Sequence, residues 1–241
     1  MKRAIIESFD LVPGRSFARK YEIVSKLGSG WEGEVYKIRE KSTGIERAVK
    51  LFFPHRNERN KAVTSYARKL HNLRACPMVI QYHTEEMIIV RKQPIRALVS
   101  EYVEGELLSD FLTRQRGGRL APFQALHLLH ALAVGLECIH RSREFHGDLH
   151  TDNIIVEHYG LSFDLRLLDF FHWTTPKREG YQNDLCEVIR IFYDALGGSR
   201  FYRKQPLEIK AIVLGLKRSL ILKRYPTTTH LRQHLESLRW E

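Results

Sequence analysis

The chain has 241 residues, enough for one large domain or two small lobes with a continuous core that needs neither disulfides nor a structural metal. Its 43% hydrophobic and 28% charged residues exclude a mainly disordered or low-complexity protein. The net charge of +11 would suit nucleic acid, but the basic residues are not interleaved with aromatic ones on a recognisable binding module, so an acidic protein partner or substrate explains the charge at least as well.

Cysteine use and hydropathy bear on the compartment. The three cysteines, at positions 76, 138 and 186, show no CxxC spacing and cannot all pair with one another, which favours a reducing compartment. The longest apolar stretch, residues 125–139, is interrupted by His and Glu and is shorter than the roughly 20 residues that cross a bilayer. We therefore expect a cytoplasmic protein without a membrane span.

The first third of the chain has the pattern of a small sheet. Alternating hydrophobicity over residues 21–27 and 34–39 predicts two strands joined by a glycine-rich tip, Gly28-Ser29-Gly30-Trp31-Glu32-Gly33. A third strand is expected over residues 46–53 and carries Lys50. Backbone N–H groups at such glycines can approach phosphate oxygens, and the lysine would add a positive charge to the same phosphates. GxGxxG also occurs in dinucleotide-binding folds, but there a helix follows, whereas here a strand follows.

The middle of the chain mixes predicted helices and strands. Residues 57–73 carry an apolar stripe at helical spacing, and their only acid is Glu58. Further strands are expected over residues 79–83, 87–91 and 95–100. A helix is expected to begin at Ser109, and the apolar run over residues 121–141 predicts a long buried helix.

The segment 146–153, His-Gly-Asp-Leu-His-Thr-Asp-Asn, and the later Asp169 carry the clearest chemical signal. An Asp with an Asn five residues later suits phosphoryl transfer, because Asp148 can orient an attacking hydroxyl while Asn153 and a second Asp hold Mg²⁺ against nucleotide phosphates. Two short predicted strands between Asn153 and Asp169 form a hairpin whose ends would bring both to one place. The alternative for Asp148 and Asn153 is a turn capped by their side chains.

Together, the glycine hairpin, Lys50 and the 146–153 segment resemble the protein-kinase-like superfamily over about residues 20 to 240. The resemblance implies one bilobal α+β domain over residues 1–241, with a small antiparallel sheet and one helix in an N-lobe to about residue 100. A hinge would follow over about residues 101–106, and a mainly helical C-lobe over about residues 107–241. The implied cofactors are ATP and Mg²⁺, with Mn²⁺ as an alternative metal.

The resemblance also assigns the site residues. Asp148, Lys50 and Asn153 would be catalytic, and Asn153 and Asp169 would bind the metal. The nucleotide would contact the glycine-rich tip, two strands and the hinge, through Gly28, Ser29, Gly30, Gly33, Val35, Ala48, Lys50, Glu101 and Val103.

The predicted helix over residues 57–73 departs from the family pattern. In the family, this helix carries a Glu that pairs with the strand lysine, and its expected position falls near Tyr66 or Lys69. Neither is acidic. Either Glu58 or another group is therefore expected to pair with Lys50.

The catalytic segment itself points in two directions. Gly147 stands where regulated protein kinases carry an Arg that receives a phosphorylated activation loop, and His150 stands where they carry a phosphate-contacting Lys. His-Gly-Asp-Leu-His is similar to aminoglycoside phosphotransferases. Later features favour protein kinases: a helix led by Asp184, which would brace the catalytic loop, and a basic-Pro-Thr entry to a last helix over residues 229–238.

The stretch after Asp169 is unusually short. Fourteen residues separate it from Asp184, and they contain no Ala-Pro-Glu; Phe171 stands where Asp-Phe-Gly has its Gly. The segment that normally forms the peptide-docking platform would then be nearly deleted. We expect a kinase without an activation-loop switch.

The predicted function is that of an ATP-dependent Ser/Thr protein kinase, which transfers the γ-phosphate to a protein hydroxyl. Its protein substrate would be acidic or a particular folded partner. Two alternatives stay open: a small-molecule phosphotransferase of the aminoglycoside-kinase type, which residues 146–150 and the short segment support, and a nucleotide-binding pseudokinase scaffold, which the missing helix carboxylate and Phe171 support.

Overall fold

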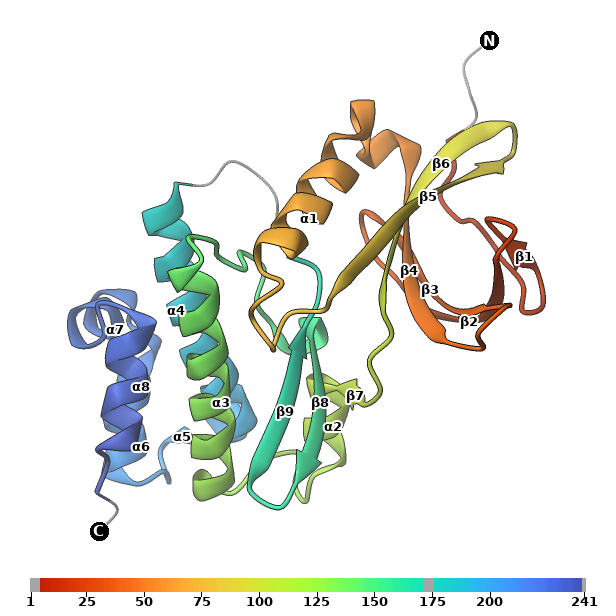
Figure 1. The fold of residues 1–241 in the computed structure, drawn as a ribbon. Coiled ribbons are helices and arrows are strands. Elements are labelled where there is room, and N and C mark those ends of the chain that lie inside the picture. The colour runs from red at the N-terminus through yellow and green to blue at the C-terminus, as the bar shows by residue number, and fades with distance from the viewer. Residues whose placement is uncertain (1–4, 171–175, 240–241) are drawn as a thin grey trace. The chain divides into compact units, whose positions relative to one another are not determined.

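The chain forms two compact units in the computed structural model, which describes residues 5–170 and 176–239 (Figure 1). The N-terminal unit runs to Arg74 and includes residues 80–103; the C-terminal unit includes residues 75–79 and continues from Glu104. A sheet with one α-helix makes up the described part of the first unit, and helices dominate the second. The expected bilobal α+β fold is confirmed.

The sheet of the N-terminal unit is antiparallel and has the order β1-β2-β3-β4-β6-β5. Its strands are β1 (Ser16–Phe17), β2 (Tyr21–Ser29), β3 (Gly33–Glu40), β4 (Glu46–Phe52), β5 (Tyr82–Val90) and β6 (Gln93–Glu101). The expected hairpin with its glycine-rich tip is β2–β3, and the strand that carries Lys50 is β4.

The prediction of two separate strands over residues 79–83 and 87–91 is wrong, because β5 is one continuous strand from Tyr82 to Val90. It turns into β6 through Arg91 and Lys92, which both have positive φ, 48° and 63°. This left-handed geometry usually selects Gly, Asn or Asp, so the sequence does not mark the turn.

The single α-helix of this unit, α1 (Lys61–Asn72), begins later than the expected residue 57. Arg59 and Asn60 have positive φ, 51° and 60°, which no α-helix accommodates, so the preceding residues form two 3₁₀ turns, Pro54–Arg56 and Glu58–Asn60. Glu58 therefore lies before α1 and not in its first turn.

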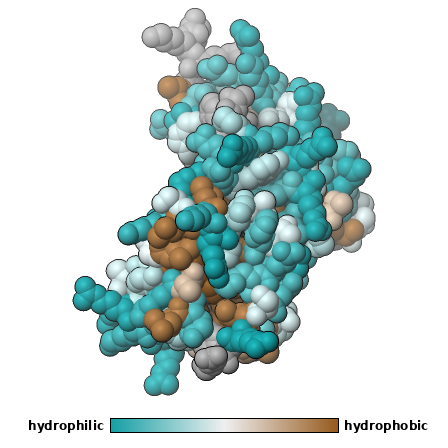
Figure 2. Space-filling model, turned by 90° about the vertical axis from the view of Figure 1, so that its left-hand side faces the viewer, coloured by the Kyte–Doolittle hydropathy of each residue, from teal (hydrophilic) through white to brown (hydrophobic). Residues whose placement is uncertain are grey.

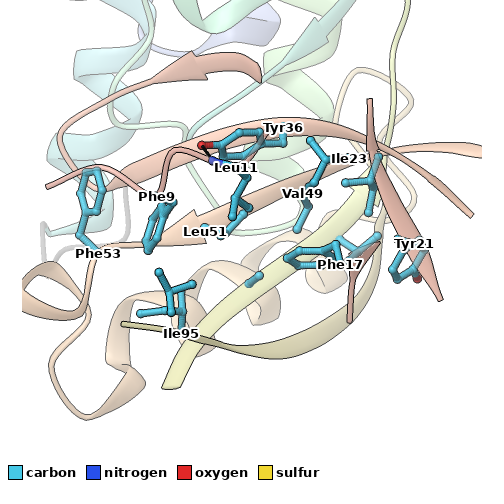
Figure 3. Close-up of a cluster of buried hydrophobic side chains, with 14 of the residues drawn as sticks. Phe9, Leu11, Phe17, Tyr21, Ile23, Tyr36, Val49, Leu51, Phe53 and Ile95 are labelled. Carbon is cyan, nitrogen blue, oxygen red and sulfur yellow. Dashed lines mark hydrogen bonds between the residues drawn. The ribbon is translucent and has the colours of Figure 1, made fainter. Parts of the chain in front are cut away.

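The core of the N-terminal unit includes apolar residues upstream of the expected kinase-like region. Ile6, Phe9 and Leu11 are each less than 8% exposed and belong to one cluster with side chains of the sheet. Figure 3 shows Phe9 and Leu11 beside Tyr36 and Leu51. The Phe9 ring stacks on Phe53 with the ring centroids 5.2 Å apart. Apolar burial of this kind stabilises by about 1.5–3 kcal/mol for each large side chain.

A buried carboxylate ties the same segment to the sheet. Glu34 on β3 is 1% exposed and accepts hydrogen bonds from the Phe9 N–H at 3.1 Å, the Ser8 hydroxyl at 3.0 Å and the Lys26 ammonium at 2.6 Å. The Tyr36 hydroxyl donates to Oε2, the oxygen that also accepts from Phe9, while Ser8 and Lys26 donate to Oε1. Burial alone would raise the pKa of Glu34, but these hydrogen bonds outweigh burial and lower it.

The C-terminal unit is built around α3 (Pro122–Arg141), which packs against α4, α8 and β9. Its other helices are α2 (Leu108–Arg114), α4 (Lys177–Ala195), α5 (Gly198–Tyr202), α6 (Leu207–Val213), α7 (Arg218–Arg224) and α8 (Thr228–Glu236). A small sheet has the order β7-β8-β9, with β7 (Glu106–Leu107), β8 (Ile154–Tyr159) and β9 (Ser162–Leu167). The expected long core helix and the hairpin after Asn153 are confirmed.

The segment 75–79 belongs to the C-terminal unit because the hairpin and α3 both hold it. The Leu167 N–H donates to Met78 O at 2.7 Å, and Cys76 forms a disulfide with Cys138 on α3. Two of the three cysteines are thus paired, and Cys186 alone is free. A reducing compartment was predicted from the spacing of the cysteines. Because Cys76 and Cys138 are paired, the cysteines do not support that prediction.

Helix α3 is the one described helix long and apolar enough, by length and composition, to cross a membrane. Half of its apolar stretch is buried inside the unit, which is also what the central helix of a globular domain shows.

Candidate active site

The glycine-rich tip is anchored to β4 at one end. The Gly30 N–H donates to Gly33 O at 2.9 Å, and Gly33 pairs with Phe52. A Cβ at Gly33 would lie 1.8 Å from Leu51 O, so only glycine allows the two backbones to approach this closely. A Cβ at Gly28 or Gly30 would meet nothing within 4 Å, so the protein's own packing does not require glycine there; backbone access for a ligand such as phosphate would.

The other predicted nucleotide-binding residues of the N-terminal unit lie on neighbouring strands. Ser29 ends β2 and faces Glu34 in the register, while Val35 on β3 pairs directly with Lys50 on β4. Ala48, two residues before Lys50, pairs with Lys37 on one side and Ser100 on the other.

Lys50 has a carboxylate partner within its own unit, and that partner is Glu32. The Lys50 Nζ lies 2.9 Å from Glu32 Oε2, and it also faces the Tyr66 ring at 5.1 Å and the Phe52 ring at 5.4 Å. The lysine is 9% exposed. The helix position near Tyr66 is thus occupied by an aromatic ring, and the acid comes from the glycine-rich tip rather than from Glu58.

Two residues of the predicted hinge follow the end of β6. Glu101 is the last residue of β6 and pairs with Arg47, and its N–H donates to Gln81 O at 3.0 Å. The Glu101 carbonyl accepts from the Ser100 hydroxyl at 3.3 Å and keeps a second lone pair for a donor such as an adenine amine. Val103 lies two residues beyond β6 and is partly exposed.

In the C-terminal unit, Asp184 on α4 braces the catalytic segment, as the sequence predicted. Its carboxylate is 1% exposed and accepts hydrogen bonds from the His146 N–H at 2.7 Å and the Gly147 N–H at 2.8 Å. A third bond, 3.0 Å long, joins it to His140 Nε2 on α3. His140 Nδ1 lies 3.4 Å from the Thr228 hydroxyl, so this carboxylate links the loop to α3, and through α3 to α8.

His146 is a packing residue with a defined protonation state. Its Nδ1 accepts from the Asp148 N–H at 3.2 Å, and its Nε2 lies 2.8 Å from Leu168 O. One nitrogen accepts and the other faces a carbonyl oxygen, so the ring is neutral with its proton on Nε2. Its ring also packs on Phe170, 4.5 Å between centroids.

Asp148 and Asn153 are brought together by a direct bond. The Asn153 side-chain amide donates to Asp148 O at 2.8 Å and lies 3.4 Å from its carboxylate oxygen. The Asp148 side chain is 58% exposed and therefore accessible to an acceptor molecule, and His150 Nε2 lies 3.8 Å from it. Because the amide nitrogen of Asn153 faces Asp148, the amide oxygen is the atom that suits a divalent cation.

Asp169 follows β9 next to the Asn153 backbone. The Leu168 N–H donates to Asn153 O at 2.9 Å, so the hairpin brings these two chain segments together as predicted. Asp169 has φ 51°, a left-handed conformation that Asp tolerates better than most residues. Oxygen ligands from an Asp and an Asn fit Mg²⁺ or Mn²⁺. Phe171, whose effect on the metal-binding turn was predicted, lies outside the described residues.

The structure adds two site residues that the sequence did not identify. Glu32 was named from the sequence only as part of the glycine-rich tip, and His140 was not singled out. For Glu32 a signal was present, because it is the only acid between Gly28 and Gly33. His140 is recognisable only once α3 and α4 are packed together.

Comparison with known proteins places these features in a family. Residues 21–187 match the family described as protein kinase domain. Serine/threonine-protein kinase pkn2 of Myxococcus xanthus is 32% identical over 153 residues, 63% of this chain and 18% of that protein. A putative cyclin-dependent kinase F-2 of Oryza sativa is 30% identical over 154 residues, 63% of this chain and 46% of that protein. The chain spans less than half of the length of either relative.

A solved structure gives the same result for the fold. The crystal structure of a mutant PknI kinase domain of Mycobacterium tuberculosis superposes with a TM-score of 0.65, over 94% of this chain and 98% of that domain, at 18% identity. The sequence match covers the glycine-rich tip, Lys50, the 146–153 segment and Asp184. The chain belongs to the protein kinase family.

Proposed function

We propose that the protein is an ATP-dependent Ser/Thr protein kinase. The observation that carries the proposal is the catalytic loop of the C-terminal unit, in which Asp148 is exposed and bonded to Asn153 while a buried carboxylate, Asp184, fixes the loop backbone. The N-terminal unit adds a lysine held by a carboxylate and a glycine-rich tip with open backbone. Relatives named as serine/threonine kinases support the reaction class.

In the proposed reaction, each residue has a separate task. Asp148 accepts a hydrogen bond from the acceptor hydroxyl, aims its oxygen at the γ-phosphorus and takes up its proton, while the bond from that phosphorus to the ADP oxygen breaks. Lys50 and the tip N–H groups bind the phosphates of ATP. Asn153 and Asp169 would hold a divalent metal, Mg²⁺ or Mn²⁺, which neutralises phosphate charge.

The test is transfer of labelled phosphate from ATP with Mg²⁺ or Mn²⁺ to generic protein acceptors and to aminoglycosides. Asp148→Asn is expected to lower kcat by about 10²–10⁴-fold, the usual contribution of a positioned base. Asp152→Asn is the matched control, an exposed acid of the same loop, and should stay within about twofold of wild type. A wild-type protein that turns over no ATP with either metal would refute the proposal, and transfer to the aminoglycoside alone would replace it by the small-molecule reading.

We further propose that the enzyme works without an activation-loop switch. Only residues 170–176 separate Asp169 from the first residue of α4, Lys177. Gly147 offers no cation beside Asp148 for a phosphorylated residue. Treatment with a phosphatase should therefore leave kcat within about twofold of that of the autophosphorylated protein. A tenfold loss would show that a phosphorylated residue is needed.

An acidic protein substrate is proposed from the charge of the C-terminal helices. Residues 198–224, which include α5, α6 and α7, contain eight Lys or Arg and one acid, Glu208. Seven of the eight are exposed, and among the described residues none of the eight forms an ion pair. Leu207 and Leu220 are exposed on the same helices. Figure 2 shows the face that lies at the left of Figure 1, where α7 and α8 are drawn. Hydrophobic residues lie on this face among hydrophilic ones.

Charge reversal tests this partner. The double variant Lys217→Glu, Arg218→Glu should raise the KM for an acidic protein acceptor about tenfold at low salt, with KM for ATP unchanged, and the difference should shrink at high salt. Arg91→Glu with Lys92→Glu in the other unit is the control of equal charge change. Equal effects of the two double variants would show that only net charge matters.

A further inference from the structure

The carboxylate beside Lys50 comes from an unexpected element. Helix α1 contains no Asp or Glu in any of its positions, Lys61–Asn72, so it cannot supply a carboxylate to the lysine. The Tyr66 ring lies instead 5.1 Å from Lys50 Nζ. Glu32 in the glycine-rich tip is 2.9 Å from the same nitrogen.

Lys50 needs a negative partner because its side chain is largely removed from water. Its side chain is 10% exposed. The ring of Phe52 on β4 and the ring of Tyr66 on α1 both lie close to its ammonium group. An ammonium removed from water is costly unless a carboxylate compensates it. Glu32 supplies that compensation at hydrogen-bonding distance, with 20% of its side chain exposed.

The position of Glu32 is fixed by the strand that carries Lys50. The Phe53 N–H, just after β4, donates to Glu32 O at 2.9 Å. The next residue, Gly33, pairs with Phe52 and has no room for a Cβ against Leu51 O. This bond and the neighbouring Gly33–Phe52 pair hold the backbone of Glu32 against the end of β4, which favours a permanent partner of Lys50 over a side chain that must move away.

We propose that Glu32 is the positioning residue for Lys50, so that the carboxylate that orients the phosphate-binding lysine is built into the phosphate-binding loop itself. This rests on the proposed function, in which Lys50 binds ATP phosphates. Orientation of the lysine then depends on the β2–β3 tip and on its pairing with β4, and displacement of α1 cannot break the pair. A protein built in this way loses the control point that a helix carboxylate provides.

Three variants test the assignment. Glu32→Gln keeps the shape and removes the charge, and it should lower kcat at least tenfold and weaken ATP binding about three- to tenfold. Glu58→Gln is the control with the same charge change on an exposed acid before α1, and should stay within about twofold in both. Adding Tyr66→Glu to Glu32→Gln places a carboxylate where the ring now faces Lys50, and should restore at least a third of the lost kcat.

Two measurements keep the inference separate from the proposed function. The affinity for a fluorescent ATP analogue reports on the phosphate contact of Lys50 even if the protein transfers no phosphate. Thermal unfolding shows whether each variant is folded. Loss of binding or kcat that Tyr66→Glu restores supports the assignment. A Glu32→Gln protein within twofold of wild type, one that binds nucleotide more tightly, or a loss that the second substitution does not restore overturns it, whether or not wild type is active.

Discussion

Asp184→Asn is the most informative single perturbation of the C-terminal unit. The carboxylate accepts hydrogen bonds of 2.7, 2.8 and 3.0 Å from the His146 N–H, the Gly147 N–H and His140. An asparagine has one oxygen and must turn its NH₂ toward a donor. In either orientation one of the two backbone N–H groups, that of His146 or that of Gly147, loses its acceptor and faces an N–H instead.

The size of the effect follows from these bonds. A hydrogen bond to a charged group contributes about 1.5–3 kcal/mol, and a buried N–H left without an acceptor costs about 1–3 kcal/mol. The better orientation of asparagine therefore costs about 3 kcal/mol of unfolding free energy, or about 6–12 °C in Tm for a chain of this size. Because the loop that carries Asp148 loses its anchor, kcat should also fall at least tenfold.

The assay pairs thermal unfolding by circular dichroism with phosphate transfer, on Asp184→Asn and on Asp194→Asn. Asp194 lies on the same helix, and burial raises its pKa, so its folded state already disfavours the charge and its neutralisation should not destabilise. If Asp184→Asn melts within about 2 °C of wild type, or no lower than Asp194→Asn, the bracing role assigned to Asp184 is wrong.

Three further outcomes are expected. Gly33→Ala should destabilise by about 2–4 kcal/mol, seen as a lower urea midpoint, because its Cβ would lie 1.8 Å from Leu51 O, whereas Gly28→Ala should fold normally. The lowered pKa of Glu34 means that its stabilisation is present above its usual value of 4.5 and is lost as the pH falls, so Glu34→Gln should flatten the loss of stability between pH 7 and pH 3 that wild type shows. Cys138→Ser should cost about 4 kcal/mol, since the disulfide closes a 62-residue separation, and a reductant should then have no added effect on Tm.

Local spacing predicted which candidate site residues lie together, because these residues are close in sequence. Asp148 and Asn153 are five residues apart, and one hairpin joins Asn153 to Asp169, so the motif and the strand pattern were enough to bring them together. The same holds for Lys50, because β4 directly follows the hairpin that carries the glycine-rich tip and pairs with its second strand. Short connections leave few alternative arrangements.

Features that depend on contacts between distant segments were missed. Ile6 and Phe9 have no periodic pattern, and their burial follows from the sheet they cover. The β5–β6 turn at Arg91 and Lys92 adopts left-handed geometry without glycine, which the two-residue hairpin connection imposes against local preference. The Lys50–Glu32 pair needs the close backbone approach at Gly33, and spacing alone does not reveal it.

The substitution of Gly147 for the usual arginine is more than the loss of a cation. Gly147 has φ 86°, a conformation that other residues adopt only with strain, and it lets two successive N–H groups, those of His146 and Gly147, point at the same buried carboxylate. Successive N–H groups arranged in this way bind an anion, and here the anion is Asp184. The loop is therefore held by the carboxylate of Asp184, which is part of the chain itself. A phosphorylated residue would find no arginine at position 147 to pair with. Together with the short stretch between Asp169 and α4, this arrangement supports the proposal of a kinase without an activation-loop switch.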